Sequence, residues 1–293
     1  MTEPFRVRRS LLYMPASNAR ALEKAKALPV DGVIFDLEDS VAPEAKAQAR
    51  VQACDAIHQG GNGRREVIVR VNAPGTDWIA EDLEAVAKAV PDAVLVPKIN
   101  KAQDIEAIFS ALDDMGVPET LRVWAMIETP AAIINAPEIG AVVQNPANRL
   151  EAWVMGTNDL ALEIGCVLEP FEPPLVVGLS RAILAARASG LTILDGVYND
   201  IADLKGFAKA CQGARNMGFD GKTLIHPNQI EPCNAAFSPS TSEITEARAI
   251  IAAFELPENQ DKGVIMLEGA MVERLHLKQA LMVVTVADAL AES

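Results

Sequence analysis

The sequence has few aromatic residues and few cysteines, and both shortages exclude kinds of protein. Phe, Trp and Tyr make up 4% of the 293 residues, whereas hydrophobic residues make up 50%. The core must therefore consist mainly of Val, Ile, Leu and Ala, which is typical of barrel interiors. The four cysteines are scattered and form no C-x-x-C pair. This pattern argues against a zinc cluster or a disulfide framework and favours ordinary buried thiols.

Long apolar runs and basic charge are also missing. No run approaches the ~20 apolar residues that span a bilayer, and the N-terminal sequence MTEPFRVRRS lacks the apolar stretch of a signal peptide. We therefore expect a cytoplasmic protein without a membrane partner. The net charge of −14 repels phosphate backbones and argues against nucleic acid as a partner. A phosphorylated small molecule stays compatible, because a local basic patch can bind it.

Short apolar runs alternate with segments of helical pattern, as in repeated βα units. Runs such as GVIFDL and AVLVP show no polar alternation, which indicates parallel strands buried on both faces. The eight expected strands are Ser10–Met14, Gly32–Leu37, Glu66–Val71, Ala93–Pro97, Arg122–Ile127, Ala152–Met155, Thr192–Leu194 and Lys222–Ile225. The expected helices between them are Asn18–Leu28, Pro43–His58, Trp78–Val90, Lys101–Met115, Pro130–Ile139, Leu175–Ser189 and Ile201–Met217. This order predicts a (β/α)8 TIM barrel, with a doubly wound open sheet as the alternative.

The pattern changes after the eighth run. A Pro/Ser-rich break at Pro232–Ser242 precedes an expected helix at Glu243–Phe254, with Ser242 or Thr241 as its N-cap. A polar loop and a second expected helix, Met271–Ala289, follow. We therefore expect a barrel domain over residues 1–231 and a C-terminal helical extension over residues 232–293. The extension would cover the opening of its own barrel or that of a neighbouring subunit.

Polar residues follow nearly every expected strand. They are Asp36, Glu38 and Asp39, then Arg70 and Asn72, Lys98, Glu128, Asn158 and Asp159, Asp195 and His226. In a barrel the C-terminal strand ends share one face, and that face holds the active site. A single carboxylate there is as often a helix N-cap, and Asp39 and Asp200 suit that structural role.

Several carboxylates that converge on one opening repel one another, and a divalent cation would relieve the repulsion. Oxygen ligands without cysteine or clustered histidine favour Mg²⁺, which takes one or two protein carboxylates. Glu128 and Asp159 end adjacent expected strands and are the predicted ligands. Arg70 lies in the otherwise apolar run EVIVRVN. It either forms a buried ion pair with Asp36 or Glu38, or binds a substrate carboxylate with its planar fork, and the two roles are compatible.

These residues belong to motifs that resemble one known family. The segments GVIFDLEDSVAPEAKAQAR, VIVRVN, VLVPKI, AMIETP, GTNDLA, GKTLIHPNQI and GAMVERLHLKQAL occur in one order along almost the whole chain. They are similar to the HpcH/HpaI aldolase/citrate lyase family, in particular its citrate lyase beta subunit-like and malyl-CoA lyase-like branch. The resemblance implies a barrel enzyme that makes or breaks a C–C bond beside an acyl thioester.

The resemblance also implies roles for individual residues. Glu128 and Asp159 match the family's Mg²⁺ ligands, Arg70 matches the arginine that binds the 2-oxo acid, and Glu38 and Asp39 match nearby catalytic acids. A family aspartate that a neighbouring subunit supplies corresponds here to Glu273, one methylene longer, for which an exposed helix charge is the alternative. We also assign substrate contacts to Pro130, Gly156 and Thr157. Homotrimers or hexamers are implied, and Lys46 and Arg50 are suggested phosphate contacts.

We accordingly expect a Mg²⁺-dependent lyase that cleaves a hydroxyacyl-CoA, such as malyl-CoA or citramalyl-CoA, into acetyl-CoA and a 2-oxo acid, glyoxylate or pyruvate. The alternatives are a malyl-CoA thioesterase, which would release free CoA, and a citrate lyase beta subunit acting on an acyl-carrier-protein thioester. A non-catalytic binding protein on the same fold is a further alternative, because fold alone does not establish activity.

Overall fold

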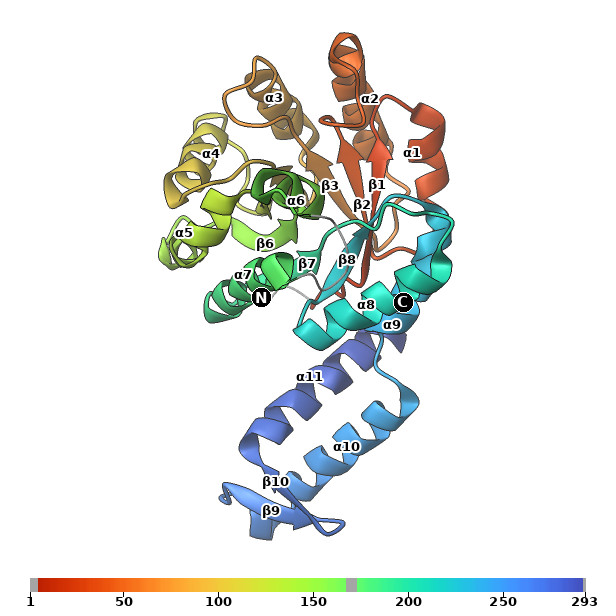
Figure 1. The fold of residues 1–293 in the computed structure, drawn as a ribbon, viewed down its shortest axis with the longest axis vertical. Helices are drawn as coiled ribbons and strands as arrows, with labels where there is room; N and C mark the ends of the chain where they lie inside the picture. Colours follow the sequence, from red (N-terminus) through yellow and green to blue (C-terminus); the bar gives the residue numbers. More distant parts are fainter. Residues whose placement is uncertain (1–4, 167–172, 292–293) are drawn as a thin grey trace. The chain divides into compact units, whose positions relative to one another are not determined.

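Eight parallel strands close into a barrel in the computed structural model, which describes residues 5–166 and 173–291. Neighbouring strands pair in chain order, and β1 also pairs with β8, so the sheet closes (Figure 1). The strands are β1 (Ser10–Pro15), β2 (Gly32–Asp36), β3 (Glu66–Arg70), β4 (Ala93–Val96), β5 (Arg122–Ile127), β6 (Leu150–Met155), β7 (Thr192–Asp195) and β8 (Gly221–Leu224). The predicted TIM barrel is confirmed, and the open sheet is excluded.

Helices surround the strands on the outside of the barrel (Figure 1). They are α1 (Ala19–Ala25), α2 (Lys46–Gln59), α3 (Ile79–Ala89), α4 (Ala102–Asp114), α5 (Pro130–Ala141), α6 (Thr157–Ile164), α7 (Pro173–Ala188) and α8 (Leu204–Met217), with 3₁₀ turns η1 (Pro43–Ala45) and η2 (Val142–Gln144). The sequence analysis missed α6, because its first residues are the polar strand-end residues themselves. Gly218 ends α8 in the left-handed region at φ 105°, a conformation that favours glycine at a helix C-terminus.

The barrel interior is mainly aliphatic, and the rings of Trp124 and the partly buried Tyr13 also belong to it. Side chains two residues apart on a strand point to the same face, so one set from each strand fills the centre. The fully buried interior side chains include Leu11, Ile34, Ile68, Leu95, Trp124 and Leu194. This core is the Val/Ile/Leu/Ala core that the scarcity of aromatics predicted.

A buried arginine fills the N-terminal end of the barrel. Arg8 Nε and Nη2 donate to the Glu66 carboxylate at 2.7 and 2.8 Å, and Nη1 donates to Thr192 Oγ1 at 3.2 Å. The guanidinium also lies 2.8 Å from Glu151 and stacks on Trp124. Arg8 therefore connects residues from β3, β5, β6 and β7 across the bottom of the barrel.

The barrel and the C-terminal part are separate compact units. The barrel unit runs from Arg8 to Ala236, and the second unit contains the described residues from Phe237 onwards, with the short segment before Arg8. The sequence analysis placed a boundary after residue 231 and began the barrel at residue 1, although residues 1–4 lie outside the described part. After a turn η3 (Pro227–Gln229), the elements are α9 (Ile230–Phe237), α10 (Thr241–Glu255), η4 (Pro257–Asn259), β9 (Val264–Leu267), β10 (Ala270–Glu273) and α11 (Arg274–Ala291).

Three expectations for this region were wrong. Helix α9 occupies much of the expected break at Pro232–Ser242. Ser240, rather than Ser242 or Thr241, caps α10. Its side chain accepts from the Glu243 amide, and the Glu243 carboxylate accepts from the Ser240 amide. The start of the second expected helix is strand β10, which pairs antiparallel with β9. The extension is therefore a helical hairpin with a small β-ribbon.

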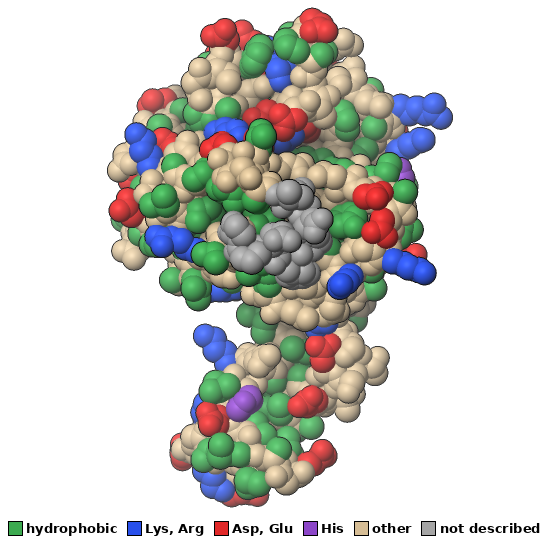
Figure 2. All heavy atoms as spheres, in the orientation of Figure 1, with side chains coloured by type: hydrophobic (Ala, Val, Ile, Leu, Met, Phe, Trp, Pro, Cys, Tyr) green, Lys and Arg blue, Asp and Glu red, His purple; other side chains and the backbone are tan. Residues whose placement is uncertain are grey.

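The C-terminal unit has a small core and exposed apolar side chains. Phe254, Ile265 and Val272 form its buried cluster. Met266 and Met271 in the ribbon and Leu275 in α11 are each more than half exposed, and hydrophobic side chains are visible on the surface of this unit (Figure 2). None of the helices in the described part of the chain has the length and apolarity required to cross a membrane.

Candidate functional site

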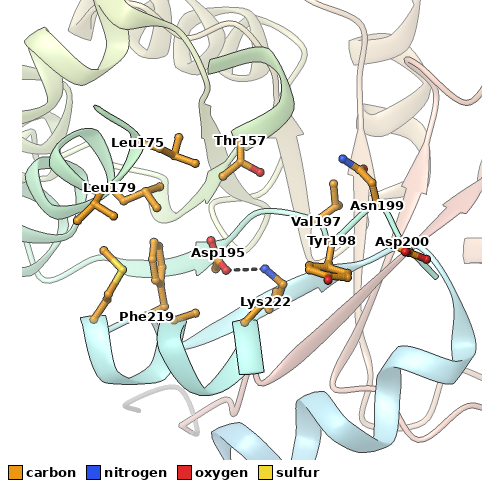
Figure 3. A pocket seen from close by; sticks show the side chains of 14 residues that line it. Thr157, Leu175, Leu179, Asp195, Val197, Tyr198, Asn199, Asp200, Phe219 and Lys222 are labelled. Carbon is orange, nitrogen blue, oxygen red and sulfur yellow. Dashed lines mark hydrogen bonds and ion pairs between the residues drawn. The ribbon is translucent and has the colours of Figure 1, made fainter. Parts of the chain in front are cut away.

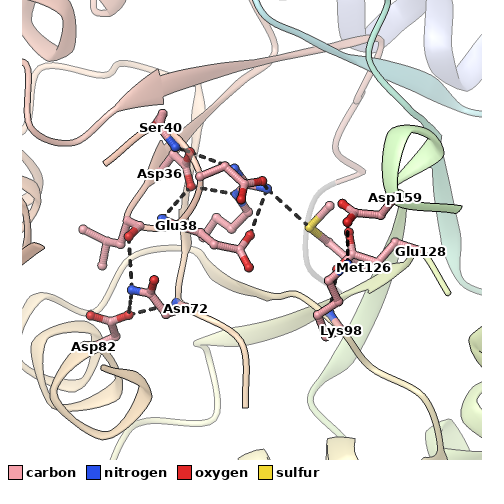
Figure 4. Close-up of polar contacts among 12 residues, drawn as sticks. Asp36, Glu38, Ser40, Asn72, Asp82, Lys98, Met126, Glu128 and Asp159 are labelled. Atoms are coloured by element: carbon pink, nitrogen blue, oxygen red, sulfur yellow. Dashed lines mark hydrogen bonds and ion pairs between the residues drawn. The ribbon is translucent and has the colours of Figure 1, made fainter. Parts of the chain in front are cut away.

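Arg70 and Asp36 form a buried bidentate ion pair at the C-terminal ends of β3 and β2. The two residues are partners in the sheet register. Arg70 Nε and Nη2 donate to the two Asp36 oxygens at 2.7 and 2.8 Å, and both residues are buried (Figure 4). The ring of Tyr13 on β1 lies 4.8 Å from the guanidinium carbon. The ion-pair role expected for Arg70 is therefore present, and Asp36 fixes the orientation of the fork.

The remaining corner of the guanidinium faces two further carboxylates. Arg70 Nη1 lies 3.0 Å from Glu38 and 3.2 Å from Asp39. It is also 3.9 Å from the sulfur of Met126, which precedes Glu128 by two residues on β5. Asp39 is not a helix N-cap, because Ala42 occupies that position of η1, so its expected structural role was wrong.

The electrostatics of this cluster favour proton binding by one carboxyl group. Burial raises the pKa of Glu38 to about 8, and Arg70 only partly offsets the effect, while the nearby negative charges of Asp39 and Glu128 raise the pKa further. The same Arg70 holds the pKa of Asp36 below its usual value despite the burial of that carboxyl. The cluster thus contains one firmly ionised acid and one that exchanges protons near neutral pH.

Glu128 and Asp159, the two predicted metal ligands, face the same cation. Asp159 Oδ1 accepts from Lys98 Nζ at 2.6 Å, and Glu128 Oε1 lies 3.9 Å from that nitrogen (Figure 4). Glu128 also accepts from the Lys98 amide at 2.7 Å. Lys98 is a non-glycine residue in the left-handed region, at φ 55°, and this uncommon conformation accompanies both contacts. One positive charge therefore already lies between the two carboxylates.

The donor set fits a magnesium ion. Burial is the main cause that raises the pKa of Glu128 to about 7, so the ionised carboxylate has too little compensating charge. No cluster of three or more His, Cys, Asp or Glu side chains suited to a metal occurs among the described residues. Mg²⁺ typically takes only one or two protein carboxylates and keeps several waters. Two carboxylates, one of them half-exposed Asp159, match that requirement.

The residues predicted to contact substrate lie around these carboxylates. Gly156 packs directly on Glu128, since a Cβ built on Gly156 would lie 2.3 Å from the Glu128 Cβ. Thr157 is the first residue of α6, two positions before Asp159. Pro130 follows Glu128 by two residues as the first residue of α5, after the N-cap Thr129. Glycine at 156 is therefore required by the close approach of Glu128.

A cavity of about 370 Å³ lies beside α6, between the barrel wall and helices α7 and α8 (Figure 3). Its walls are mostly apolar and include Leu175, Leu179 and Phe219. A buried ion pair, Lys222 Nζ to Asp195 Oδ2 at 2.5 Å, lines one side. Of the residues that the sequence analysis placed at the active-site face, Thr157 and Asp195 line this cavity.

The structure places three other residues singled out from the sequence, Glu273, Lys46 and Arg50, in contacts with protein groups other than Glu128 and Asp159. Glu273 ends β10 in the C-terminal unit, and its amide donates to His276 Nδ1. Lys46 is buried and donates to two carbonyls and to Asn72, so the suggested phosphate contact was wrong for this residue. Arg50 pairs with Glu81 and with Asp82. The sequence analysis missed the Lys98 bridge, although lysine at a strand end beside two acids was a usable signal.

Fold and site together define a (β/α)8-barrel protein with carboxylates and an arginine at the C-terminal strand ends. Residues 9–227 match the model of the HpcH/HpaI aldolase/citrate lyase family, and the chain belongs to this family. It is 47% identical to a (3S)-malyl-CoA thioesterase of Cereibacter sphaeroides (strain KD131 / KCTC 12085), over 97% of this chain and 95% of the relative.

Two further relatives belong to the citrate lyase branch. The citrate lyase subunit beta of Escherichia coli (strain K12) is 32% identical, over 97% of this chain and 94% of that protein. The crystal structure of CitE from Mycobacterium tuberculosis, in complex with magnesium, acetoacetate and coenzyme A, is similar with a TM-score of 0.76. That match has 30% identity and covers 97% of this chain and all of the CitE chain. The similarity therefore extends through the C-terminal unit as well as the barrel.

Proposed function

We propose that this protein is a Mg²⁺-dependent enzyme that hydrolyses the thioester of a hydroxyacyl-CoA such as malyl-CoA. The observation that carries the proposal is the arrangement of Arg70, Glu128 and Asp159 at one end of the barrel. The 47% identity to a malyl-CoA thioesterase over nearly the full length of both chains favours this substrate and this reaction. The magnesium and coenzyme A in the related CitE structure favour the same cofactor and the same class of ligand.

In this proposal Glu128 and Asp159 hold the ion, and Arg70 binds the free carboxylate of the acyl group. Asp36 holds the guanidinium by two hydrogen bonds, and the substrate carboxylate would take the place of Asp39 at the Nη1 corner, where Glu38 and Asp39 lie at 3.0 and 3.2 Å. When bound, Mg²⁺ polarises the substrate oxygens as a Lewis acid. Glu38, whose pKa is about 8, takes a proton from water while the water oxygen bonds to the thioester carbonyl carbon. The C–S bond then breaks, the proton passes to the leaving sulfur, and malate and CoA are released.

The second candidate is the C–C lyase that the sequence motifs imply, and the relationship to citrate lyase subunits favours it. The same residues would bind the same substrate. A carboxylate would remove the proton from the hydroxyl group, and the bond between the hydroxyl-bearing carbon and the α-carbon would break to give glyoxylate and the enolate of acetyl-CoA. Protonation of that enolate at the α-carbon would then give acetyl-CoA. Citramalyl-CoA would give pyruvate instead, and a carrier-protein thioester would replace CoA in a citrate lyase complex.

Product analysis separates the candidates. Purified protein is incubated with malyl-CoA and Mg²⁺, and products are identified by mass spectrometry. We expect free CoA and malate in equal amounts. Acetyl-CoA with glyoxylate would establish the lyase instead, and no turnover of malyl-CoA or citramalyl-CoA with Mg²⁺ would refute both candidates. The Glu128→Ala variant, which lacks one proposed ligand, is the control and should show neither reaction.

We also propose a homotrimer, or a hexamer of trimers, in which Glu273 completes the site of a neighbouring subunit. The exposed Met266, Met271 and Leu275 of the C-terminal unit support such an interface. Mixing inactive Glu128→Ala and Glu273→Ala proteins under exchange conditions should restore part of the activity, because some sites would then contain both intact residues. A mixture that stays inactive while subunits demonstrably exchange would refute a shared site.

A further inference from the structure

Lys46 lies beneath the loop that presents Glu38 and Asp39, and its ammonium group donates to that loop and to Asn72. Nζ donates to Leu37 O at 2.9 Å, to Glu38 O at 3.1 Å and to Asn72 Oδ1 at 2.6 Å. The residue is 4% exposed, and the Trp78 ring lies 4.8 Å from Nζ. A lysine ammonium has three donors, and these three bonds use all of them. Lys46 therefore fixes two consecutive peptide carbonyls rather than a ligand.

The opposite side of the same loop is held by a carboxylate. Asp36 Oδ1 accepts from the Glu38 amide at 2.9 Å, and Asp36 Oδ2 accepts from the Ser40 amide at 3.1 Å. The Glu38 and Ser40 amides of this loop are thus bound by an anion, and the Leu37 and Glu38 carbonyls are bound by a cation. Since Asp36 also binds Arg70, the same carboxylate holds both the loop and the guanidinium.

Asn72 links this loop to a buried acid on α3. Its Nδ2 donates to Leu37 O at 3.1 Å and to Asp82 Oδ2 at 2.6 Å, and its own amide donates to Asp82 Oδ2 at 2.8 Å. Asp82 is fully buried and also accepts from Arg50. Asn72 follows Arg70 by two residues, so the strand that carries the arginine is tied to the loop that carries its acidic partners.

We propose that Lys46 and Asn72 are positioning residues that hold the Leu37–Ser40 loop, and through it the Glu38 carboxylate, against Arg70. They act on turnover through Glu38 and do not touch the substrate or the metal carboxylates. The kinetic part of this inference rests on the proposed function, whereas the structural part does not. Misplacing a reacting group by about 1 Å can lower turnover by about 100-fold.

The test compares Lys46→Met with Arg149→Met. Arg149 is the control, because it is also 4% exposed and donates to the carbonyls of Pro118, Leu121 and Val117, in addition to its ion pair with Asp113, but it precedes β6 at the opposite end of the barrel. Asn72→Ala is a second, milder variant in case Lys46→Met does not fold. The measurements are kcat and KM on malyl-CoA, Mg²⁺ affinity by calorimetry, and hydrogen–deuterium exchange of the peptide containing residues 37–41.

We expect Lys46→Met and Asn72→Ala to lower kcat by about 10- to 100-fold, with KM and Mg²⁺ affinity within about threefold of wild type. Exchange in residues 37–41 should become faster in both variants and stay unchanged in Arg149→Met. Unchanged loop exchange would overturn the proposal, whatever happens to kcat. A kcat loss of equal size in Arg149→Met would also overturn it. If wild-type protein turns over no hydroxyacyl-CoA, the proposed function fails, and loop exchange alone then decides the positioning role.

Discussion

Removing the charge of Glu128 should stabilise the metal-free protein at alkaline pH. Burial raises the pKa of this carboxyl from 4.5 to about 7, so the folded protein favours the protonated form. The penalty for ionised Glu128 is absent below about pH 4.5, grows as the pH rises and is complete above about pH 7. At about 1.4 kcal/mol per pKa unit, it reaches about 3 kcal/mol.

The assay is denaturant unfolding of wild type and Glu128→Gln between pH 5 and 8.5, with chelator or with Mg²⁺. Glutamine keeps the oxygen that accepts from the Lys98 amide. With chelator, we expect nearly equal stability at pH 5 and a variant more stable by about 2–3 kcal/mol at pH 8. Mg²⁺ should stabilise wild type at pH 8 and have little effect on the variant. Equal pH dependence of the two proteins in chelator, or equal stabilisation by Mg²⁺, would refute the charge assigned to Glu128.

Further outcomes follow from the same geometry. Mg²⁺ affinity of wild type should fall by about tenfold per pH unit below pH 7, because the ion must displace a proton from Glu128; calorimetry at constant ionic strength measures this, and a flat profile contradicts it. Arg70→Lys should lower kcat/KM for malyl-CoA by at least about 100-fold, since a point charge cannot replace the bidentate fork; unchanged kinetics would remove Arg70 from the site. Gly156→Ala should abolish Mg²⁺ binding, because its Cβ would collide with Glu128, whereas Gly178→Ala, with 3.7 Å to the nearest atom, should bind normally; equal metal affinities would disprove the packing argument.

The barrel could be predicted from sequence because its strands are buried on both faces. Short, mostly apolar runs mark most of the strands, and each observed strand boundary lies within two residues of the expected one. The β-ribbon of the C-terminal unit escaped detection for the opposite reason. Its strands expose Met266 and Met271, and no glycine or proline separates β10 from α11 in the sequence. Helical periodicity therefore extended over residues that pair as a strand.

The site could be predicted as a set of residues but not as a set of contacts. Strand-end positions and family motifs identified Arg70, Glu128 and Asp159, because parallel strands bring their ends to one face. The sequence left open whether Arg70 pairs with Asp36 or with Glu38, and the structure has both contacts. The sequence also suggested Lys46 as a phosphate contact, whereas in the structure its ammonium group donates to backbone carbonyls. Spacing alone does not reveal burial, and burial decides whether a lysine binds a ligand or the backbone.

The arginine at the bottom of the barrel has a consequence for how a large ligand is accommodated. Arg8, with Glu66, Glu151 and Trp124, occupies the N-terminal end of the interior, and breaking this set would leave a buried charge without its counter-charge. Passage of a ligand through that end would therefore be costly, so we expect substrate to enter and product to leave at the C-terminal ends of the strands. For a bulky thioester, only the acyl end would reach the carboxylates, while the nucleotide end would remain outside the strands. Departure of one product would then have to precede arrival of the next substrate.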